Sequence, residues 1–117
     1  MCGQGQTSSE SSIVQRLMEV IEERKKNPTA TSYTAQLFAG GVTAIGRKVT
    51  EEAEEVVEAA GEPGESGRDH LVREVADLVY HVLVLLAACQ RRWSDVEKVL
   101  TDRFGTSGIQ EKESRRK

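Results

Sequence analysis

Residues 48–86 hold two helical patterns separated by a glycine-rich break, and each pattern sets carboxylates beside an apolar stripe. The first pattern is KVTEEAEEVVEAA from Lys48, and the second is EVADLVYHVLVLL from Glu74. At about 100° per residue, the apolar residues of each pattern gather on one side of a helix. The sequence therefore predicts two helices that pack together through their apolar sides.

The apolar faces determine where each carboxylate is expected. Glu54 and Glu58 fall opposite the apolar face of the first helix, so they are expected in solvent. Glu52 and Glu55 instead fall on the flank of that face. The residues expected to face inward are Val42, Ile45, Val49, Ala53, Val56 and Ala60 on the first helix, and Leu71, Val75, Val79, Val82, Leu86 and Cys89 on the second.

Packing these helices would bring Glu52 and Glu55 close to Glu74 and Asp77, which line one edge of the second helix. Like charges three or four residues apart destabilise a helix by roughly 0.2–0.5 kcal/mol per pair. A hard divalent cation would remove that repulsion, and oxygen ligands suit Mg²⁺, with Mn²⁺ as a possible substitute. The alternative is a solvated face with ordinary ion pairs, 47 to 51 and 48 to 52. Asp77 favours the metal site, because it interrupts an otherwise apolar segment.

The remaining patterns predict an all-α fold, an antiparallel bundle of four to five helices. The predicted helices span residues 13–27, 32–38, 42–60, 69–91 and 94–104. Ser12 and Ser32 are expected to cap helices, and Gly40-Gly41 is expected to end the second one. The domain is expected over residues 12–105, after a disordered extension of residues 1–11 and before a polar tail of residues 106–117.

The apolar arc of the fourth predicted helix is wider than a small bundle can cover. A partner helix from a second subunit would cover it, which predicts a homodimer formed by helix packing. Within one subunit, Cys89 is expected to be a small filler of the core.

Composition limits the partners and the compartment. The chain has 117 residues and a net charge of −3, with no basic stripe to meet phosphates, which argues against a nucleic-acid partner. Its two cysteines are too few for a disulfide framework, and we expect a reducing cytoplasm. The longest apolar run is shorter than the ~20 residues that span a bilayer, and no secretory signal is recognisable, so no membrane partner is expected.

The spacing of the possible ligand residues distinguishes between the types of metal and phosphate site that the chain could form. A di-iron bundle needs Glu-x-x-His pairs, but Gly67 precedes His70 and Leu78 precedes His81 at that spacing. Two scattered histidines do not provide a zinc site, and the double glycine lacks the Gly-Lys-Ser/Thr of a P-loop. A carboxylate-bound Mg²⁺ with basic and hydroxyl groups nearby suits hydrolysis of a phosphate ester or pyrophosphate.

The acidic motifs resemble those of a known superfamily. EExxE at residues 51–55, followed by ExxD at residues 74–77, is similar to the MazG-type all-α nucleotide pyrophosphatases. Three further stretches resemble the phosphoribosyl-ATP pyrophosphatase family of histidine biosynthesis: SYTAQL at 32–37, ADLVYHVLVL at 76–85 and RFGTSGIQEKESR at 103–115. The resemblance covers roughly residues 17–115.

This resemblance implies Mg²⁺-dependent hydrolysis of phosphoribosyl-ATP to phosphoribosyl-AMP and pyrophosphate by a helical homodimer. It implies that Glu52, Glu55, Glu74 and Asp77 are metal ligands and catalytic residues, with Glu51 auxiliary. The implied substrate contacts are Arg24, Ser32, Tyr33, Thr34, Lys48, Arg103, Ser107, Lys112 and Arg115, so the polar tail is expected to contribute to substrate binding. The chain departs from the family pattern at Gln36, Thr50 and Glu113.

Two other functions remain open at this point. A general nucleotide pyrophosphatase that removes altered deoxynucleotides would use the same metal site. A non-catalytic helical dimerisation module would carry the acidic face without using it. A module of that kind should be indifferent to Mg²⁺, whereas an enzyme that binds the ion should gain thermal stability from it.

Overall fold

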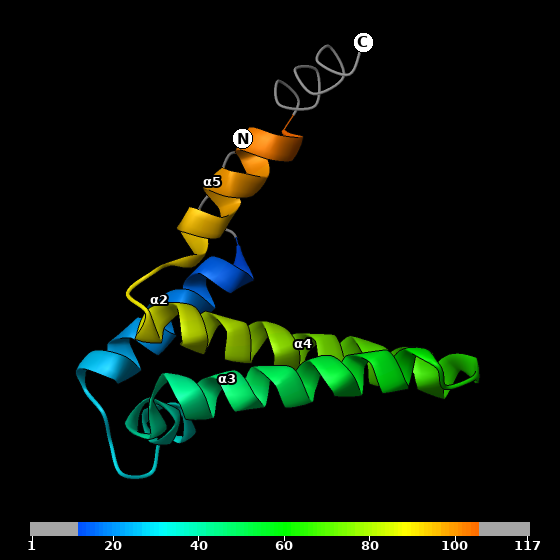
Figure 1. Ribbon diagram of the computed structural model, residues 1–117, viewed down its shortest axis with the longest axis horizontal. Helices are drawn as coiled ribbons and strands as arrows, with labels where there is room; N and C mark the ends of the chain where they lie inside the picture. Colours follow the sequence, from blue (N-terminus) through cyan, green and yellow to red (C-terminus); the bar gives the residue numbers. More distant parts are fainter. Residues whose placement is uncertain (1–11, 106–117) are drawn as a thin grey trace, which may run out of the picture.

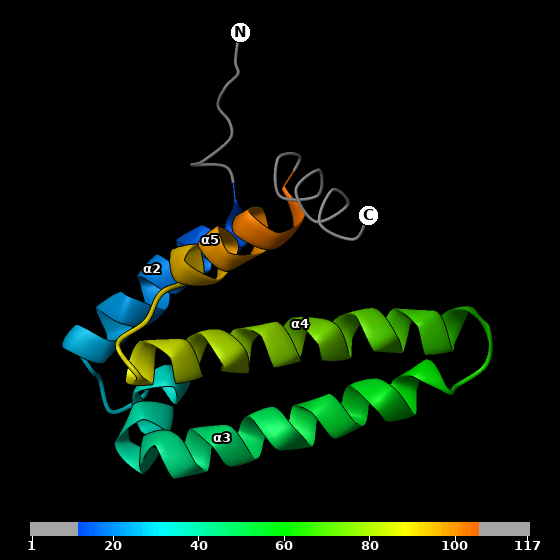
Figure 2. The ribbon, with the colours of Figure 1, turned by 45° about the horizontal axis from the view of Figure 1, so that its top comes forward.

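Two long antiparallel helices form the spine of the molecule, and two shorter helices lie together at one end of it (Figures 1 and 2). The computed structural model describes residues 12–105. Its four helices are α2 (Ile13–Lys26), α3 (Tyr33–Ala60), α4 (Gly64–Ala88) and α5 (Trp93–Phe104), with no strand among the described residues. The prediction of an all-α antiparallel bundle is confirmed.

The first two helices begin at the serines that the sequence marks as caps. The Ser12 hydroxyl accepts a hydrogen bond from the Gln15 backbone N–H at 3.2 Å, and the Ser32 hydroxyl accepts one from Ala35 at 3.1 Å. Each bond satisfies one of the N–H groups left without a partner at a helix start. Helix α2 ends at Lys26, just before Asn27-Pro28.

The prediction of a short helix that ends at Gly40-Gly41 agrees with the backbone. Helix α3 consists of two helical pieces joined at a kink, because the backbone leaves the helical region at Gly41, where φ is 83° and ψ is 177°. A positive φ of this size strains a side-chain-bearing residue, and glycine avoids that strain. The kink turns the first part of α3, including Tyr33, away from the axis of the long part.

Helix α4 begins at Gly64, earlier than the predicted start at residue 69. Gly67 is consequently buried within its first turns, where a Cβ would lie 2.5 Å from the Glu62 carbonyl oxygen. The glycine therefore serves close packing, and the sequence-based interpretation of it as a loop residue is wrong.

At its other end α4 stops at Ala88, before the predicted end at Arg91. Gln90 has a left-handed φ of 64°, and this turn closes the helix. The Arg91 N–H donates to the Leu86 carbonyl at 2.8 Å, and the Gln90 N–H donates to Ala87 at 3.0 Å. These two bonds form a Schellman motif, which usually has glycine at the left-handed position. Helix α5 then begins at Trp93.

The core lies where α2 crosses the base of the α3–α4 pair. Its buried residues are Met18, Ile21, Leu37, Ile45, Leu83, Val84 and Ala87. The predicted inward faces are partly wrong, because Val42 and Ala60 on α3 are exposed, as are Val75 and Cys89 at the α4 face. Helix α4 is apolar nearly all round from residue 82 to 88, so periodicity alone does not select the side that α2 covers.

Away from this core, α4 exposes an apolar stripe. Val72 is 68% exposed and Val75 is 40% exposed, and they share one helix face with Ala76 and Val79. Val57 on α3 is 71% exposed. Among the described residues no helix is both long and apolar enough to cross a membrane.

Candidate active site

Three carboxylates meet between the two long helices. Glu52 and Glu55 come from α3 and Glu74 comes from α4, and one oxygen of each lies within 4.8 Å of the others. Glu52 is buried, Glu74 is half-buried and Glu55 is exposed, so the group opens to solvent on one side. The antiparallel pairing of α3 and α4 brings these residues together from distant parts of the chain.

Two oxygens of this group are buried without a hydrogen-bond partner: Oε1 of Glu52 and Oε1 of Glu74. Buried polar atoms normally have partners, and an unpaired carboxylate oxygen is costly to desolvate. The opposite oxygen of each group faces a base, with Lys48 Nζ 3.9 Å from Glu52 Oε2 and His70 Nε2 3.1 Å from Glu74 Oε2. Each carboxylate is thus held through one oxygen and leaves the other available to a ligand.

This donor set fits a hard divalent cation. Mg²⁺ and Mn²⁺ prefer carboxylate oxygens, and Mg²⁺ keeps several waters, which the open side next to Glu55 would admit. The hydrogen bond and the charge of Glu74 raise the pKa of Glu55 above its ordinary value, since two carboxylates this close repel when both are ionised. This repulsion favours a protonated Glu55 carboxyl group, and a bound cation would displace that proton.

His70 positions the Glu74 carboxylate. Its Nδ1 lies 3.0 Å from Glu62 Oε1 and its Nε2 lies 3.1 Å from Glu74 Oε2. Both ring nitrogens must carry a proton to donate to both carboxylates, so this geometry favours the imidazolium. The hydrogen bond to Glu62, followed by the contact with Glu74, raises the pKa of His70. Its i,i+4 spacing to Glu74 is the sequence signal for this contact.

The raised pKa of His70 predicts a pH-dependent stability in the metal-free protein. Its stabilising contribution is fully present below pH 6.5 and is lost as the pH rises through the higher folded-state pKa. We therefore expect the free energy of unfolding, from urea denaturation in chelator, to fall as the pH rises above 6.5. The His70→Gln variant should lack this component, and equal slopes for the two proteins would contradict the assignment.

A cleft of about 410 Å³ adjoins the acidic group. Its polar lining comprises Tyr33, Gln36, Arg47, Lys48 and Glu51, and the Lys48 ammonium lies 3.5 Å from the Glu51 carboxylate. Burial lowers the pKa of Lys48, but Tyr33, Glu51 and Glu52 outweigh it, so the pKa is raised and the side chain stays cationic. An anion in this cleft would meet Arg47 and Lys48 beside the candidate metal centre.

Comparison with known proteins agrees with this arrangement. The family model described as phosphoribosyl-ATP pyrophosphohydrolase matches residues 14–104. The chain belongs to this family. It is 48% identical over 100 residues to the phosphoribosyl-ATP pyrophosphatase of Rhodopirellula baltica, covering 86% of this chain and 83% of that protein. The enzyme of the same name from Geotalea daltonii is 48% identical over 103 residues, covering 88% and 94%.

A third phosphoribosyl-ATP pyrophosphatase, from Paramagnetospirillum magneticum, is 46% identical over 110 residues, covering 94% of this chain and 98% of the relative. This chain is accordingly an enzyme of the hydrolase class. Arg47 is a cleft residue that sequence reasoning did not select as a site residue, although it directly precedes Lys48.

The other acids that the sequence singled out on these two helices lie outside the group of three. Asp77 is exposed one turn beyond Glu74 and does not join the close group, so its role as a ligand stays a prediction. Its backbone carbonyl accepts a hydrogen bond from His81 Nδ1 at 2.8 Å. Glu54 and Glu58 are exposed, as the helical faces predict.

The hydroxyl groups predicted to contact the substrate differ in their exposure and in their hydrogen bonds within the protein. Thr34 is buried and bonded to the Tyr80 hydroxyl at 2.5 Å, whereas Tyr33 is 48% exposed and lines the cleft. His81 Nδ1 donates to a carbonyl, so in the neutral ring Nε2 accepts, and the Tyr33 hydroxyl donates to it at 3.0 Å. Tyr33 can therefore only accept a hydrogen bond from a ligand.

The other predicted contacts are not brought to the acidic group within this chain. Arg24 is exposed in the last turn of α2, and Arg103 is exposed in the last turn of α5. Ser32 lies at the start of α3, where its hydroxyl caps the helix. Ser107, Lys112 and Arg115 lie outside the described residues, as do the predicted N-terminal extension and polar tail.

Proposed function

We propose that this chain hydrolyses phosphoribosyl-ATP to phosphoribosyl-AMP and pyrophosphate, the second step of histidine biosynthesis, in a Mg²⁺-dependent reaction in the cytoplasm. The reaction takes up one water and breaks the bond between the α- and β-phosphates. The observation that carries the proposal is the pair of buried carboxylate oxygens without partners, Glu52 Oε1 and Glu74 Oε1, in a chain with this family's sequence. The relatives' names supply the substrate.

Glu52, Glu55 and Glu74 would hold the metal ion, with Asp77 as a fourth candidate and Mn²⁺ as a substitute for Mg²⁺. When bound, the ion would supply Lewis-acid charge to the phosphate oxygens. Lys48 would hold one oxygen of Glu52 in place, and His70 would do the same for Glu74. The second oxygen of each acid, which has no hydrogen-bond partner, would be the one that binds the cation.

The cleft beside the acids is the proposed binding place for the substrate's triphosphate. Arg47 and Lys48 present positive charge there, and the planar guanidinium of Arg47 can donate two hydrogen bonds to one phosphate. Tyr33 presents an acceptor, which suits a ribose hydroxyl or the adenine amino group and not a phosphate. The contributions of Arg24, Ser32, Thr34, Arg103 and the tail, with Glu51 auxiliary at the metal, remain predictions.

A homodimer is part of the proposal. The stripe of Val72, Val75, Ala76 and Val79 has the spacing of a helix-packing face; Val79 packs against the core, but Val72, Val75 and Ala76 are exposed in the single chain. The core of one chain is confined to the base of the hairpin, so an apolar face along its length is unpaired. A second copy supplies a matching face by two-fold symmetry.

A pyrophosphate-release assay tests the assignment. Phosphoribosyl-ATP should be hydrolysed in Mg²⁺ with a kcat/KM at least about 100-fold above those for ATP and dUTP, because a site that binds the additional ribose phosphate rejects nucleotides without it. Chelator should abolish the release. Comparable rates on all three nucleotides would favour the general nucleotide pyrophosphatase, and no release with any of them would favour a non-catalytic module.

A further inference from the structure

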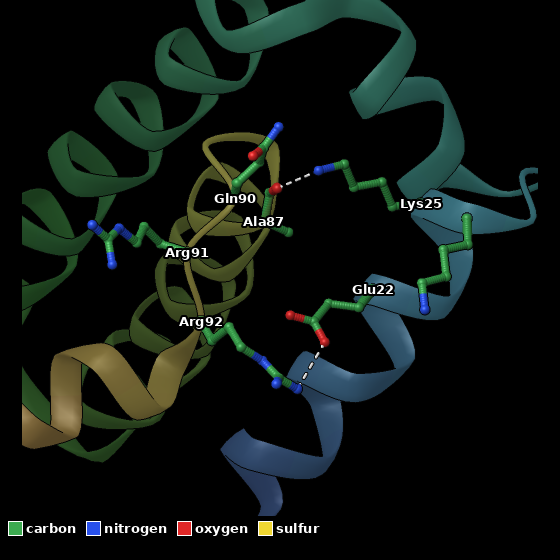
Figure 3. Close-up of a pocket in the computed structure, with 7 residues that line it drawn as sticks. Glu22, Lys25, Ala87, Gln90, Arg91 and Arg92 are labelled. Carbon is green, nitrogen blue, oxygen red and sulfur yellow. Dashed lines mark hydrogen bonds and ion pairs between the residues drawn. The ribbon is translucent and has the colours of Figure 1, made fainter.

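A second cleft lies where the end of α2 meets the end of α4 (Figure 3). Its volume is about 540 Å³, and its charged lining is Glu22, Lys25, Lys26, Arg91 and Arg92. Four cations thus surround one carboxylate, in a chain whose net charge is −3. Ala87 in this cleft is roughly 20 Å along α4 from Glu74, at 1.5 Å rise per residue. We call this hollow the basic cleft.

The single carboxylate of the basic cleft is already matched by one cation. Glu22 Oε1 lies 3.1 Å from Arg92 Nη2, and Arg91 is paired with Asp95 outside the lining, so the excess positive charge lies on Lys25 and Lys26. The Lys25 ammonium donates to the Ala87 carbonyl at 2.6 Å, so one of the cations is held across the cleft (Figure 3). Arg91 extends away from α2 in Figure 3, its side chain is 70% exposed, and its Nη1 lies 3.8 Å from Asp95 Oδ2.

Capping of α4 does not account for this concentration of cations. Lysine and arginine often satisfy the last carbonyls of a helix. Here backbone N–H groups already do so, because Leu86 accepts from Arg91 and Cys89, and Ala87 accepts from Gln90. Only Lys25 among these cations bonds a carbonyl of the helix end, while Arg91 and Arg92 form ion pairs through exposed side chains that an anion could also contact.

Gln90 gives a second indication. It holds the left-handed position of the Schellman turn, where glycine is usual, so a side chain is kept at the expense of backbone strain. Figure 3 shows its side-chain amide reaching toward the same side of the cleft as the Lys25 ammonium. The Gln90 amide therefore adds a neutral hydrogen-bond donor to the charged donor of Lys25. Phosphate oxygens can accept hydrogen bonds from both kinds of donor.

We propose that the basic cleft binds a phosphate monoester through Lys26, Arg92 and Gln90, with Lys25 and Arg91 adding charge. Charge-assisted hydrogen bonds to phosphate are the strongest that lysine and arginine side chains form. The volume of the basic cleft is large enough to admit a sugar phosphate. The phosphate would come either from the far end of the proposed substrate or from a separate molecule. Binding at the cleft does not depend on the proposed hydrolytic activity.

Ribose 5-phosphate is the probe, titrated calorimetrically into full-length protein in chelator. Without metal, the acidic group repels anions. The double variant Lys26→Gln/Arg92→Gln should bind the probe about tenfold more weakly. The control Lys98→Gln/Arg68→Gln removes the same two residue types from exposed positions outside the cleft and should leave the affinity unchanged. Equal weakening in both, or no saturable binding by the unmodified protein, would overturn the proposal.

A variant that gains affinity separates a built site from general electrostatics. Glu22→Gln removes the carboxylate that lines the cleft among the described residues and releases Arg92, so the probe should bind about threefold more tightly. Glu65→Gln releases Arg68 in the same way on an exposed face and should change nothing. If the two variants behave alike, the cleft is not the binding place.

Kinetics with phosphoribosyl-ATP then identify the source of the phosphate. If the cleft holds the substrate's own distal phosphate, the double variant should raise KM with little change in kcat. If it holds a separate molecule, KM should be unchanged while ribose 5-phosphate binding is still lost. Either result supports the cleft as a phosphate site, and the calorimetry stands even if the chain does not hydrolyse phosphoribosyl-ATP.

Discussion

Glu52→Gln should lower Mg²⁺-dependent turnover by about 100-fold or more, because it removes a charged ligand from the most buried position of the acidic group. The side chain keeps its size, so the helices should still form. We expect the melting temperature in chelator to be nearly unchanged, whereas the rise on adding Mg²⁺ in the unmodified protein should disappear. Pyrophosphate release and thermal melts with and without the ion measure the two effects.

Glu58→Gln is the matched control for this experiment. Glu58 lies on the same helix and loses the same charge, but its side chain is exposed and outside the acidic group. Its turnover and Mg²⁺-dependent melting should match those of the unmodified protein. Similar losses in both variants would mean that overall helix charge matters, and the assignment of the metal ligands would fail.

Val72→Glu should convert the proposed homodimer to monomers at micromolar concentration. The Val72 side chain is 68% exposed in one chain, so a carboxylate there costs the monomer little. In a helix-packed dimer the same carboxylate would be buried without a partner, which should weaken association by about 100-fold or more. Sedimentation equilibrium measures the change directly.

Ser66→Glu is the control for the dimer. Ser66 is exposed on the same helix but off the apolar stripe, so it adds an equal charge without entering the proposed interface. This variant should remain dimeric. An unmodified protein that sediments as a monomer would refute the dimer outright, and a dimeric Val72→Glu variant would place the interface elsewhere.

The features that sequence reasoning predicted well depend on neighbouring residues. Ser12 and Ser32 cap helices because each hydroxyl reaches an N–H three residues on. Glu52 and Glu55 lie beside the apolar face because helical geometry places them there. Their proximity to Glu74 required only that the two long helices pack antiparallel through a short turn.

The features that it missed depend on contacts between distant segments. Gly67 looks like a loop residue until the Glu62 backbone is seen against it. The buried side of α4 depends on where α2 crosses, which a helix apolar nearly all round does not reveal. The basic cleft joins dibasic pairs at residues 25–26 and 91–92, and the contact from Lys25 to Ala87 spans 62 positions. The Lys-Lys and Arg-Arg pairs were visible in the sequence, but nothing local indicated that they would meet.

The two unpaired buried oxygens belong to opposite legs of the helical hairpin, Glu52 on α3 and Glu74 on α4. An ion that binds both would act as a removable cross-link, closing residues 53–73 into a ring. Cross-links reduce the entropy of the opened state, so separation of the legs would be resisted most at that point. Amide hydrogen exchange should accordingly slow near residues 52 and 74 when Mg²⁺ is added, while the turn at Gly61 keeps exchanging rapidly. A bound metal ion would therefore limit how far local unfolding, starting at the turn between α3 and α4, can extend along the helical hairpin.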